Sequence, residues 1–259
     1  MSALPPASAP STPARMTFMQ HLVELRRRLL WAVVGLFVAT LLCLGFAPQL
    51  FEWLRTPLAI VEQDKLIVLS PLELYVTYLK LGVLAALFVG SPWCLYQLWL
   101  FVSPGLYSHE KRWVVPFIVL GTLFFVGGGL FSFYVVLPIG FKYVLAEMPQ
   151  TIIPQFSVAV YFELVTNLSL AFGVVFELPL VMWILSAARI VKPAFYTKMR
   201  RYWIVVAFII AAILTPPDPF TQTLMAIPLL AFFELGVLGA KLLYRRAESR
   251  ASRLPAAVG

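Results

Sequence analysis

Long apolar runs constrain this chain more than any other feature of its sequence. Leu29–Ala47 and Trp113–Gly140 contain no charged residue, and about 20 apolar residues are enough to cross the hydrocarbon core of a bilayer. Only 12% of the 259 residues are charged, whereas a soluble domain has roughly a quarter. The runs are apolar on all sides rather than alternating, which favours helices over the strands of a β-barrel. We therefore expect an all-α integral membrane protein.

The distribution of apolar residues, charges and prolines predicts six membrane spans. We expect them at Leu29–Ala47, Leu72–Val102, Arg112–Phe141, Tyr161–Ala188, Trp203–Leu214 and Phe220–Ala240, with a separate short helix at Phe18–Arg28 before the first. Gly127-Gly128-Gly129 is expected to interrupt the third span. Residues 1–16 are rich in Pro, Ser and Ala and are expected to form a disordered extension. The membrane domain then covers residues 17–243, and 244–259 form a basic cytoplasmic tail.

Basic residues give the orientation of these spans. All but four of the 20 Lys and Arg residues fall in segments that share one side of the membrane, the exceptions being Arg55, Lys65, Lys80 and Lys142. The positive-inside rule then puts both termini in the cytoplasm. Because the basic residues alternate with apolar spans, the net charge of +8 reflects topology and does not indicate nucleic-acid binding.

The last two spans are unusual in their length. Trp203–Leu214 lies between Arg201 and the helix-breaking Pro216-Pro217, and twelve helical residues extend only about 18 Å. A bilayer core is about 30 Å thick. We therefore predict that the membrane is thinned beside spans five and six.

Enzymatic chemistry is not expected. The three glycines lack the Lys-Ser/Thr of a phosphate-binding loop, and no nucleophile–base set is apparent. Cys43 and Cys94 lie inside predicted spans, and His21 and His109 are isolated, so no metal site or cofactor is predicted.

Two acidic residues stand among basic ones on the predicted inner face. Glu24 lies in His21–Leu30 (HLVELRRRLL), and Glu110 precedes Lys111 and Arg112. Both carboxylates could form local salt bridges, with Arg28 in the first case. They could instead accept guanidinium groups from a ligand, because carboxylates pair well with arginine in a bidentate geometry.

Other polar residues lie inside or at the ends of the spans. A charged Glu177 at mid-helix would cost about 2.5–3.5 kcal/mol, so it is protonated, paired or in contact with water. Glu177 and Lys80 together could couple ions in a secondary transporter, although no internal repeat supports that class. Asp218 could cap the sixth span, or with Thr221 and Gln222 it could contact another membrane helix.

Several segments together resemble one known family. They are His21–Leu30, Ser70–Glu73 (SPLE), Tyr96–Tyr107 (YQLWLFVSPGLY) with His109-Glu110, Phe176–Pro179 (FELP) and Leu214–Gln222 (LTPPDPFTQ). In this order they are similar to the signature segments of TatC, the largest core subunit of the twin-arginine protein translocase. The resemblance covers about Thr17–Leu243.

The resemblance implies a non-enzymatic receptor in a prokaryotic cytoplasmic membrane. Such a receptor binds twin-arginine signal peptides, organises TatA and TatB for export of folded proteins driven by the proton-motive force, and associates with further copies of itself. By motif, Glu24 and Glu110 would contact the paired arginines, with Arg26 and Phe101 beside them and Pro57 in the first outer loop. Glu177 would face the concave groove of a glove-shaped fold. Leu214, Thr215, Asp218 and Gln222 would belong to the docking zone for the single-span partners.

Overall fold

The computed structural model describes residues 18–60, 66–102, 114–149, 151, 154–214 and 218–252. The helices are α1 (Phe18–Leu44), α2 (Ala47–Leu54), α3 (Thr56–Ile60), α4 (Glu73–Val89), α5 (Ser91–Val102), α6 (Val114–Phe131), α7 (Leu137–Ala146), α8 (Val158–Phe176), α9 (Leu178–Ala187), α10 (Pro193–Leu214) and α11 (Pro219–Ser252). A π-helical turn, η3 (Ser132–Val136), joins α6 to α7. Two short strands, β1 (Leu66–Ile67) and β2 (Phe156–Ser157), pair in parallel.

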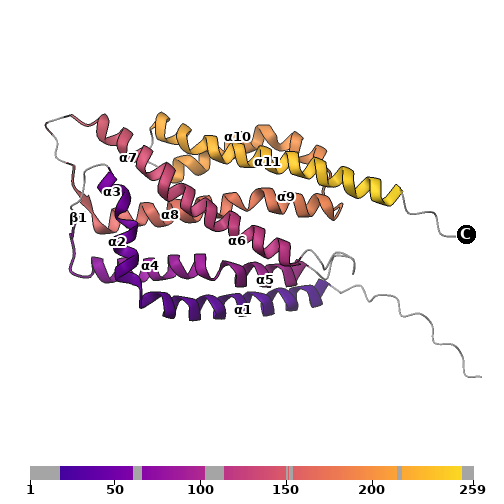
Figure 1. The fold of residues 1–259 in the computed structure, drawn as a ribbon, viewed down its shortest axis with the longest axis horizontal. Helices are drawn as coiled ribbons and strands as arrows, with labels where there is room; N and C mark the ends of the chain where they lie inside the picture. Colours follow the sequence, from indigo (N-terminus) through magenta and orange to yellow (C-terminus); the bar gives the residue numbers. More distant parts are fainter. Residues whose placement is uncertain are drawn as a thin grey trace, which may run out of the picture.

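The long helices run side by side, and the start of α1 and the end of α11 lie at the same end of the bundle (Figure 1). We call this the basic end, because it carries Arg26, Arg27 and Arg28 of α1, the basic first turns of α10 and the basic last turns of α11. The end of α5 and the turn between α9 and α10 lie there too. At the opposite end are α2, α3, α7 and the strand pair.

Four of the described helical segments are long and apolar enough to span a membrane, and the bent pair α4–α5 makes a fifth. They are Met19–Leu44, Val114–Ala146, Val158–Ala187, Pro219–Arg246 and the pair from Glu73 to Phe101, which bends by 55°. The sixth, α10, does not qualify on apolar length alone, because Lys198, Arg200 and Arg201 occupy its first half. The predicted six-helix membrane architecture is therefore recovered with α10 as the short apolar span.

The start of the chain differs from the prediction. α1 is one continuous helix of 27 residues, not a short helix at Phe18–Arg28 followed by a span. Nothing at Arg28-Leu29 breaks a helix, since Leu, Glu and Arg all have high helix propensity. The first span is thus continuous with about three turns of mixed polar and apolar residues at the basic end.

Three of the spans are broken near their middles. α4 gives way to α5 at Gly90, before Pro92; α8 gives way to α9 at Glu177, before Pro179. The third span was expected to be interrupted at Gly127–Gly129, which is wrong: α6 runs straight through these glycines. The irregular turn is η3 instead, directly before Pro138. A proline lacks an N–H and clashes with the preceding turn, and a π-turn relieves that conflict.

The glycines of α6 allow close packing rather than a break. A Cβ added to Gly128 would lie 2.5 Å from the carbonyl oxygen of Phe172 on α8, and one on Gly129 would lie 2.4 Å from the ring of Phe88. Gly173 of α8 faces Phe125 in the same way. Small residues let helix backbones approach closely in membranes, where packing rather than the hydrophobic effect drives association.

The segment Arg189–Tyr202, which the sequence predicts as an inner loop between the spans Tyr161–Ala188 and Trp203–Leu214, is largely helical, because α10 begins at Pro193. Proline is well tolerated in the first turn of a helix. The helix has 22 residues, about 33 Å, so only its apolar portion, Trp203–Leu214, is short. Arg200 forms a salt bridge of 2.6 Å with Glu234 of α11, which neutralises both charges where the apolar portion begins.

The sixth span also extends beyond its predicted limits. α11 contains Pro228 without breaking and continues to Ser252. The domain boundary predicted at residue 243 therefore does not coincide with a helix end. The predicted extension at residues 1–16 lies outside the described residues.

Aromatic side chains fill the centre of the bundle. The ring of Phe176 lies 3.5 Å from that of Phe232, and Phe131 lies 5.9 Å and 5.6 Å from Phe172 and Phe176, measured between ring centroids. Phe133, Phe162 and Phe172 are fully buried. This core holds α6, α8 and α11 together and fixes the position of the residues between α8 and α9.

Candidate functional site

Glu24 lies on the face of α1 that packs against the bundle. Its Oε1 accepts a hydrogen bond of 2.6 Å from Nε of Arg28, one turn later, and both side chains are largely buried. His21, one turn earlier on the same face, stacks on Phe101 of α5 with ring centroids 4.4 Å apart. The local salt bridge considered from the sequence is thus formed. The carboxylate is held at the basic end in a guanidinium-binding geometry, and Phe101 of α5 is stacked on His21, one turn away on α1.

Glu110 lies outside the described residues, as does Thr215. The segment that carries Glu110 leaves α5 after Val102 and returns to α6 at Val114. Both of these helix ends lie at the basic end (Figure 1).

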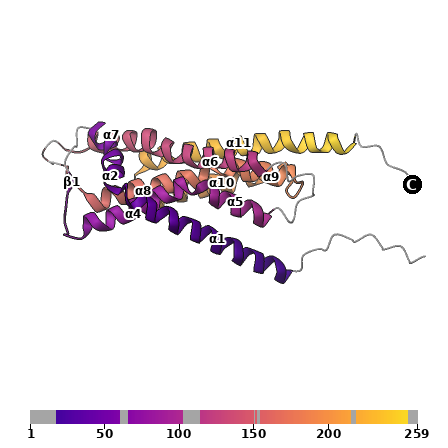
Figure 2. The ribbon, with the colours of Figure 1, turned by 60° about the horizontal axis from the view of Figure 1, so that its bottom comes forward.

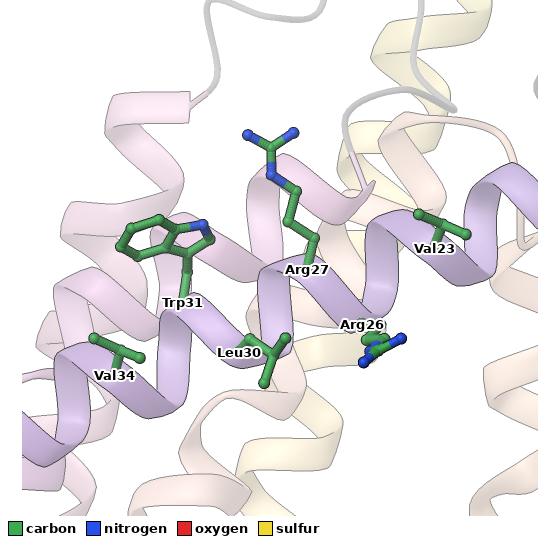
Figure 3. A pocket seen from close by; sticks show the side chains of 6 residues that line it. All are labelled: Val23, Arg26, Arg27, Leu30, Trp31 and Val34. Carbon is green, nitrogen blue, oxygen red and sulfur yellow. The ribbon is translucent and has the colours of Figure 1, made fainter.

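Arg26 does not share a face with Glu24. Residues two positions apart on an α-helix point about 200° apart, and Arg26 is exposed whereas Glu24 is partly buried. Arg26 lies instead beside Arg27 on the surface of α1 that faces away from the bundle (Figure 3). The structure therefore separates two residues that the family resemblance groups together.

Glu177 occupies the break between α8 and α9. Its backbone N–H bonds to the carbonyl of Val174, while its Oε1 is buried without a hydrogen-bond partner among the described residues. Gly121 of α6 makes room for the carboxyl group: a Cβ there would lie 3.4 Å from Oε1 of Glu177 and 2.8 Å from Leu95 of α5. An unpartnered carboxyl oxygen therefore sits at mid-span, where three helices meet.

Lys80 lies apart from Glu177. Its ammonium group pairs with Glu163 of α8 at 3.4 Å, and both side chains are about half exposed. The pairing of Lys80 with Glu177 that an ion-coupled transporter would use is not present.

The turn before α11 is organised by Asp218. One carboxylate oxygen accepts a bond of 2.7 Å from the backbone N–H of Thr221, and the other accepts the hydroxyl of Thr221. These bonds to Thr221 lower the pKa of Asp218 below its usual value. Gln222 donates from Nε2 to the carbonyl of Phe208 on α10 at 3.0 Å. The helix-capping interpretation of Asp218 is therefore confirmed, and Gln222 ties α10 to α11 near Leu214, the last residue of α10.

Pro57 lies in the short helix α3 at the opposite end and is fully buried. Nearby, the hydroxyl of Tyr161 donates to the carbonyl of Leu54 at 2.6 Å. Pro57 thus belongs to the packing of the α2–α3 segment, in which α3 contacts α7 and α2 is bonded to α8 through Leu54.

Glu73, which belongs to the Ser70–Glu73 segment of the family resemblance, has a role that the sequence alone did not reveal. Glu73 accepts three backbone N–H groups: Leu69 at 2.5 Å and Ser70 at 3.2 Å through Oε2, and Ala159 at 2.6 Å through Oε1. It thereby joins the segment after β1 to the first turn of α8. The pattern Ser70-Pro-Leu-Glu73 has the S-x-x-E spacing of a capping box, which could have revealed the bond to Ser70.

Comparisons with known proteins give the family. The family model for "Sec-independent protein translocase protein (TatC)" matches residues 20–228. The chain belongs to the TatC family. TatC of Magnetococcus marinus is 39% identical over 237 residues, covering 90% of this chain and 88% of the relative. TatC of Aquifex aeolicus is 38% identical over 236 residues, covering 89% and 97%. Escherichia coli TatC is 35% identical over 232 residues, covering 89% and 90%.

A crystal structure of the twin-arginine translocase receptor TatC matches the fold with a TM-score of 0.78 and 38% identity, covering 86% of this chain and 99% of the other. As a TatC protein, the chain is a core subunit of the twin-arginine translocase, a membrane-bound protein transport system, and is not an enzyme. The alternative of a secondary transporter is not supported.

Proposed function

We propose that the basic end of this protein receives twin-arginine signal peptides, and that Glu24 and Glu110 bind their paired guanidinium groups. The observation that carries the proposal is the Glu24–Arg28 bond of 2.6 Å. It is an intramolecular version of the bond that a ligand arginine would form. Charge-assisted guanidinium–carboxylate bonds are directional and selective for arginine over lysine.

Binding at Glu24 is then an exchange of partners. A signal-peptide arginine replaces Arg28 on a carboxylate that is already largely removed from water, so little further desolvation is needed. Arg28 is released toward the membrane surface. Glu110 supplies the second carboxylate from the segment between α5 and α6, whose two ends lie at the basic end.

The basic end faces the cytoplasm of a prokaryotic cell in this proposal. The support is the concentration of Arg and Lys at that end, which the positive-inside rule assigns to the cytoplasmic side. Both termini are then cytoplasmic.

The apolar stretch of the signal peptide lies along a concave groove near Glu177. The support is the unpartnered Oε1 of Glu177, which is positioned at a helix break between α5, α6 and α8. A polar group held this way inside a membrane protein is a candidate for ligand contact.

Single-span partners of the TatA and TatB type dock beside α10 and α11. Leu214, Thr215, Asp218 and Gln222, at the turn between α10 and α11, form one end of this surface, and the short apolar portion of α10 strains the bilayer beside it. Further copies of the chain complete a multi-copy receptor, and the proton-motive force drives export.

The test is photo-crosslinking of a synthetic signal peptide to the full-length protein in lipid nanodiscs. Glu24→Gln should reduce the yield for an Arg-Arg peptide at least tenfold, and Glu110→Lys should abolish it. Replacement of the peptide arginines by lysines should have a similar effect. Glu163→Gln is the matched control, because Glu163 also pairs with a cation but lies on α8, away from the basic end. Unchanged crosslinking in Glu24→Gln and Glu110→Lys would show that the peptide binds elsewhere.

A further inference from the structure

One face of α1 near the basic end is uncovered and combines cationic with apolar side chains. Val23, Arg26, Arg27, Leu30, Trp31 and Val34 line a shallow pocket of about 480 Å³ (Figure 3). These residues follow the i, i+3, i+4 spacing of a single helix face. We call this face the outer α1 face. Arg26 points about 200° away from Glu24, whereas Arg27 and Trp31, which follow Glu24 by three and seven residues, border the side of α1 that carries Glu24.

We propose that the outer α1 face binds one anionic phospholipid, with its phosphate at Arg26 and Arg27 and an acyl chain along Leu30, Trp31 and Val34. This site is distinct from the peptide-binding site at Glu24, and the proposal does not depend on the proposed function.

The charges on this face favour an anion. Arg28 is neutralised by Glu24, but neither Arg26 nor Arg27 forms a salt bridge with any residue in the described part of the chain. The two side chains leave the helix on either side of Leu30 (Figure 3). Two uncompensated guanidinium groups next to a membrane attract anionic headgroups, and arginine matches the geometry of a phosphate.

The apolar part of the face matches an acyl chain in both position and composition. Leu30, Trp31 and Val34 follow the arginines within two turns, and each is at least 50% exposed. A rise of 1.5 Å per residue puts Val34 about 12 Å deeper than Arg26, which corresponds to the step from phosphate to hydrocarbon. Tryptophan is enriched at this interface.

The face is held in a fixed orientation. The indole Nε1 of Trp93 on α5 donates to the backbone carbonyl of Trp31 at 3.0 Å, and a Cβ on Gly35 would collide with the same indole ring. Below this contact, α1 diverges from the other helices toward its first turn (Figure 2). The pocket is therefore built on an anchored helix, and none of the described helices covers it.

The site also gives Arg26 a role. Arg26 and Glu24 point in opposite directions from α1, so a lipid bound at Arg26 leaves the Glu24 carboxylate accessible. As a lipid ligand, Arg26 would hold α1, and with it Glu24, at a constant depth in the membrane.

Fluorescence quenching by brominated lipids tests the proposal. The full-length protein is reconstituted in phosphatidylcholine containing increasing fractions of brominated phosphatidylglycerol or brominated phosphatidylcholine. The contribution of Trp31 is obtained as the difference from Trp31→Phe, measured in each variant. Each surface arginine contributes on the order of a fivefold preference for an anionic lipid. We therefore expect half-maximal quenching of Trp31 at a mole fraction of brominated phosphatidylglycerol that is at least tenfold lower than the mole fraction of brominated phosphatidylcholine required.

Arg26→Gln/Arg27→Gln should abolish this preference, while Arg26→Lys/Arg27→Lys should retain part of it and so shows that the fold tolerates changes here. Arg245→Gln/Arg246→Gln is the matched control: it removes the same charge from exposed positions on α11 at the same end and should leave the preference intact. An equal loss in both Gln variants would mean only diffuse surface attraction and would overturn the site. An unchanged preference in Arg26→Gln/Arg27→Gln would overturn it as well, as would displacement of the brominated lipid from Trp31 by a signal peptide.

Discussion

The close approach of α6 to α8 at Gly128 can be tested by adding a single methyl group. A Cβ at Gly128 would lie 2.5 Å from the carbonyl oxygen of Phe172, 2.8 Å from Cγ of Phe176 and 2.9 Å from the carbonyl carbon of Phe172. A carbon–oxygen contact is normally at least about 3.3 Å, so the two helices would have to separate by roughly 0.8 Å. The nearest atoms belong to backbone and cannot move away as a flexible side chain would.

Gly127 provides the matched control, because a Cβ there would meet no atom within 4 Å. Gly127→Ala and Gly128→Ala gain the same helix propensity, about 1 kcal/mol. The difference between the two variants therefore isolates the steric cost, for which overpacking suggests about 1–3 kcal/mol. At about 2–4 °C per kcal/mol for a chain of this size, Gly128→Ala should melt about 2–12 °C below Gly127→Ala.

The assay is thermal unfolding in detergent micelles, followed with a thiol-reactive fluorescent dye that reports exposure of Cys43 and Cys94. Both cysteines are free and partly buried, and neither lies on α6 or α8. Equal melting temperatures for the two variants would refute the close contact between α6 and α8.

Three further perturbations address other contacts. Glu73→Gln removes the charge that accepts three backbone N–H groups, so we expect a loss of about 1–3 kcal/mol and faster hydrogen exchange at the start of α8. For Asp218, the pKa lowered by Thr221 means that its stabilisation is complete above the unfolded pKa, about 3.9, and is lost as the pH falls through the folded value. Hydrogen exchange at the first amides of α11, corrected for intrinsic rates, should therefore become faster in the wild type as the pH falls through the folded pKa of Asp218. Asp218→Asn should remove this dependence of the exchange rate on pH. A double-mutant cycle of Arg200→Gln and Glu234→Gln should give a coupling of at most about 1 kcal/mol, because both side chains are 44% exposed; a coupling of several kcal/mol would contradict this assessment.

The helical membrane spans could be predicted from the sequence because apolar length determines them directly. The spans and the capping role of Asp218 follow from short-range patterns. The prediction that Gly127–Gly129 interrupts the third span was wrong, because these glycines serve close packing between helices and the low helix propensity of glycine does not end α6 there. The effect of proline on a helix also differs between two positions: a π-turn precedes Pro138, whereas α11 continues through Pro228.

The candidate site could be predicted only in part. The local pairing of Glu24 with Arg28 follows from i,i+4 spacing. The separation of Arg26 from Glu24 also follows from helix geometry, but the family resemblance groups them by function and not by face. The contacts of Lys80 with Glu163 and of Glu73 with Ala159 join residues more than 80 positions apart, and no local pattern specifies such pairs.

The aromatic core has a consequence for how a folded protein crosses the membrane. Rings of α6, α8 and α11 lie in direct contact in the middle of the bundle, where neighbouring helix axes are separated by only about 8–10 Å. A folded domain is tens of ångströms across. Its passage through the interior of one subunit would require this core to be dismantled. We therefore expect the route for cargo to lie outside this helix bundle and not through its interior.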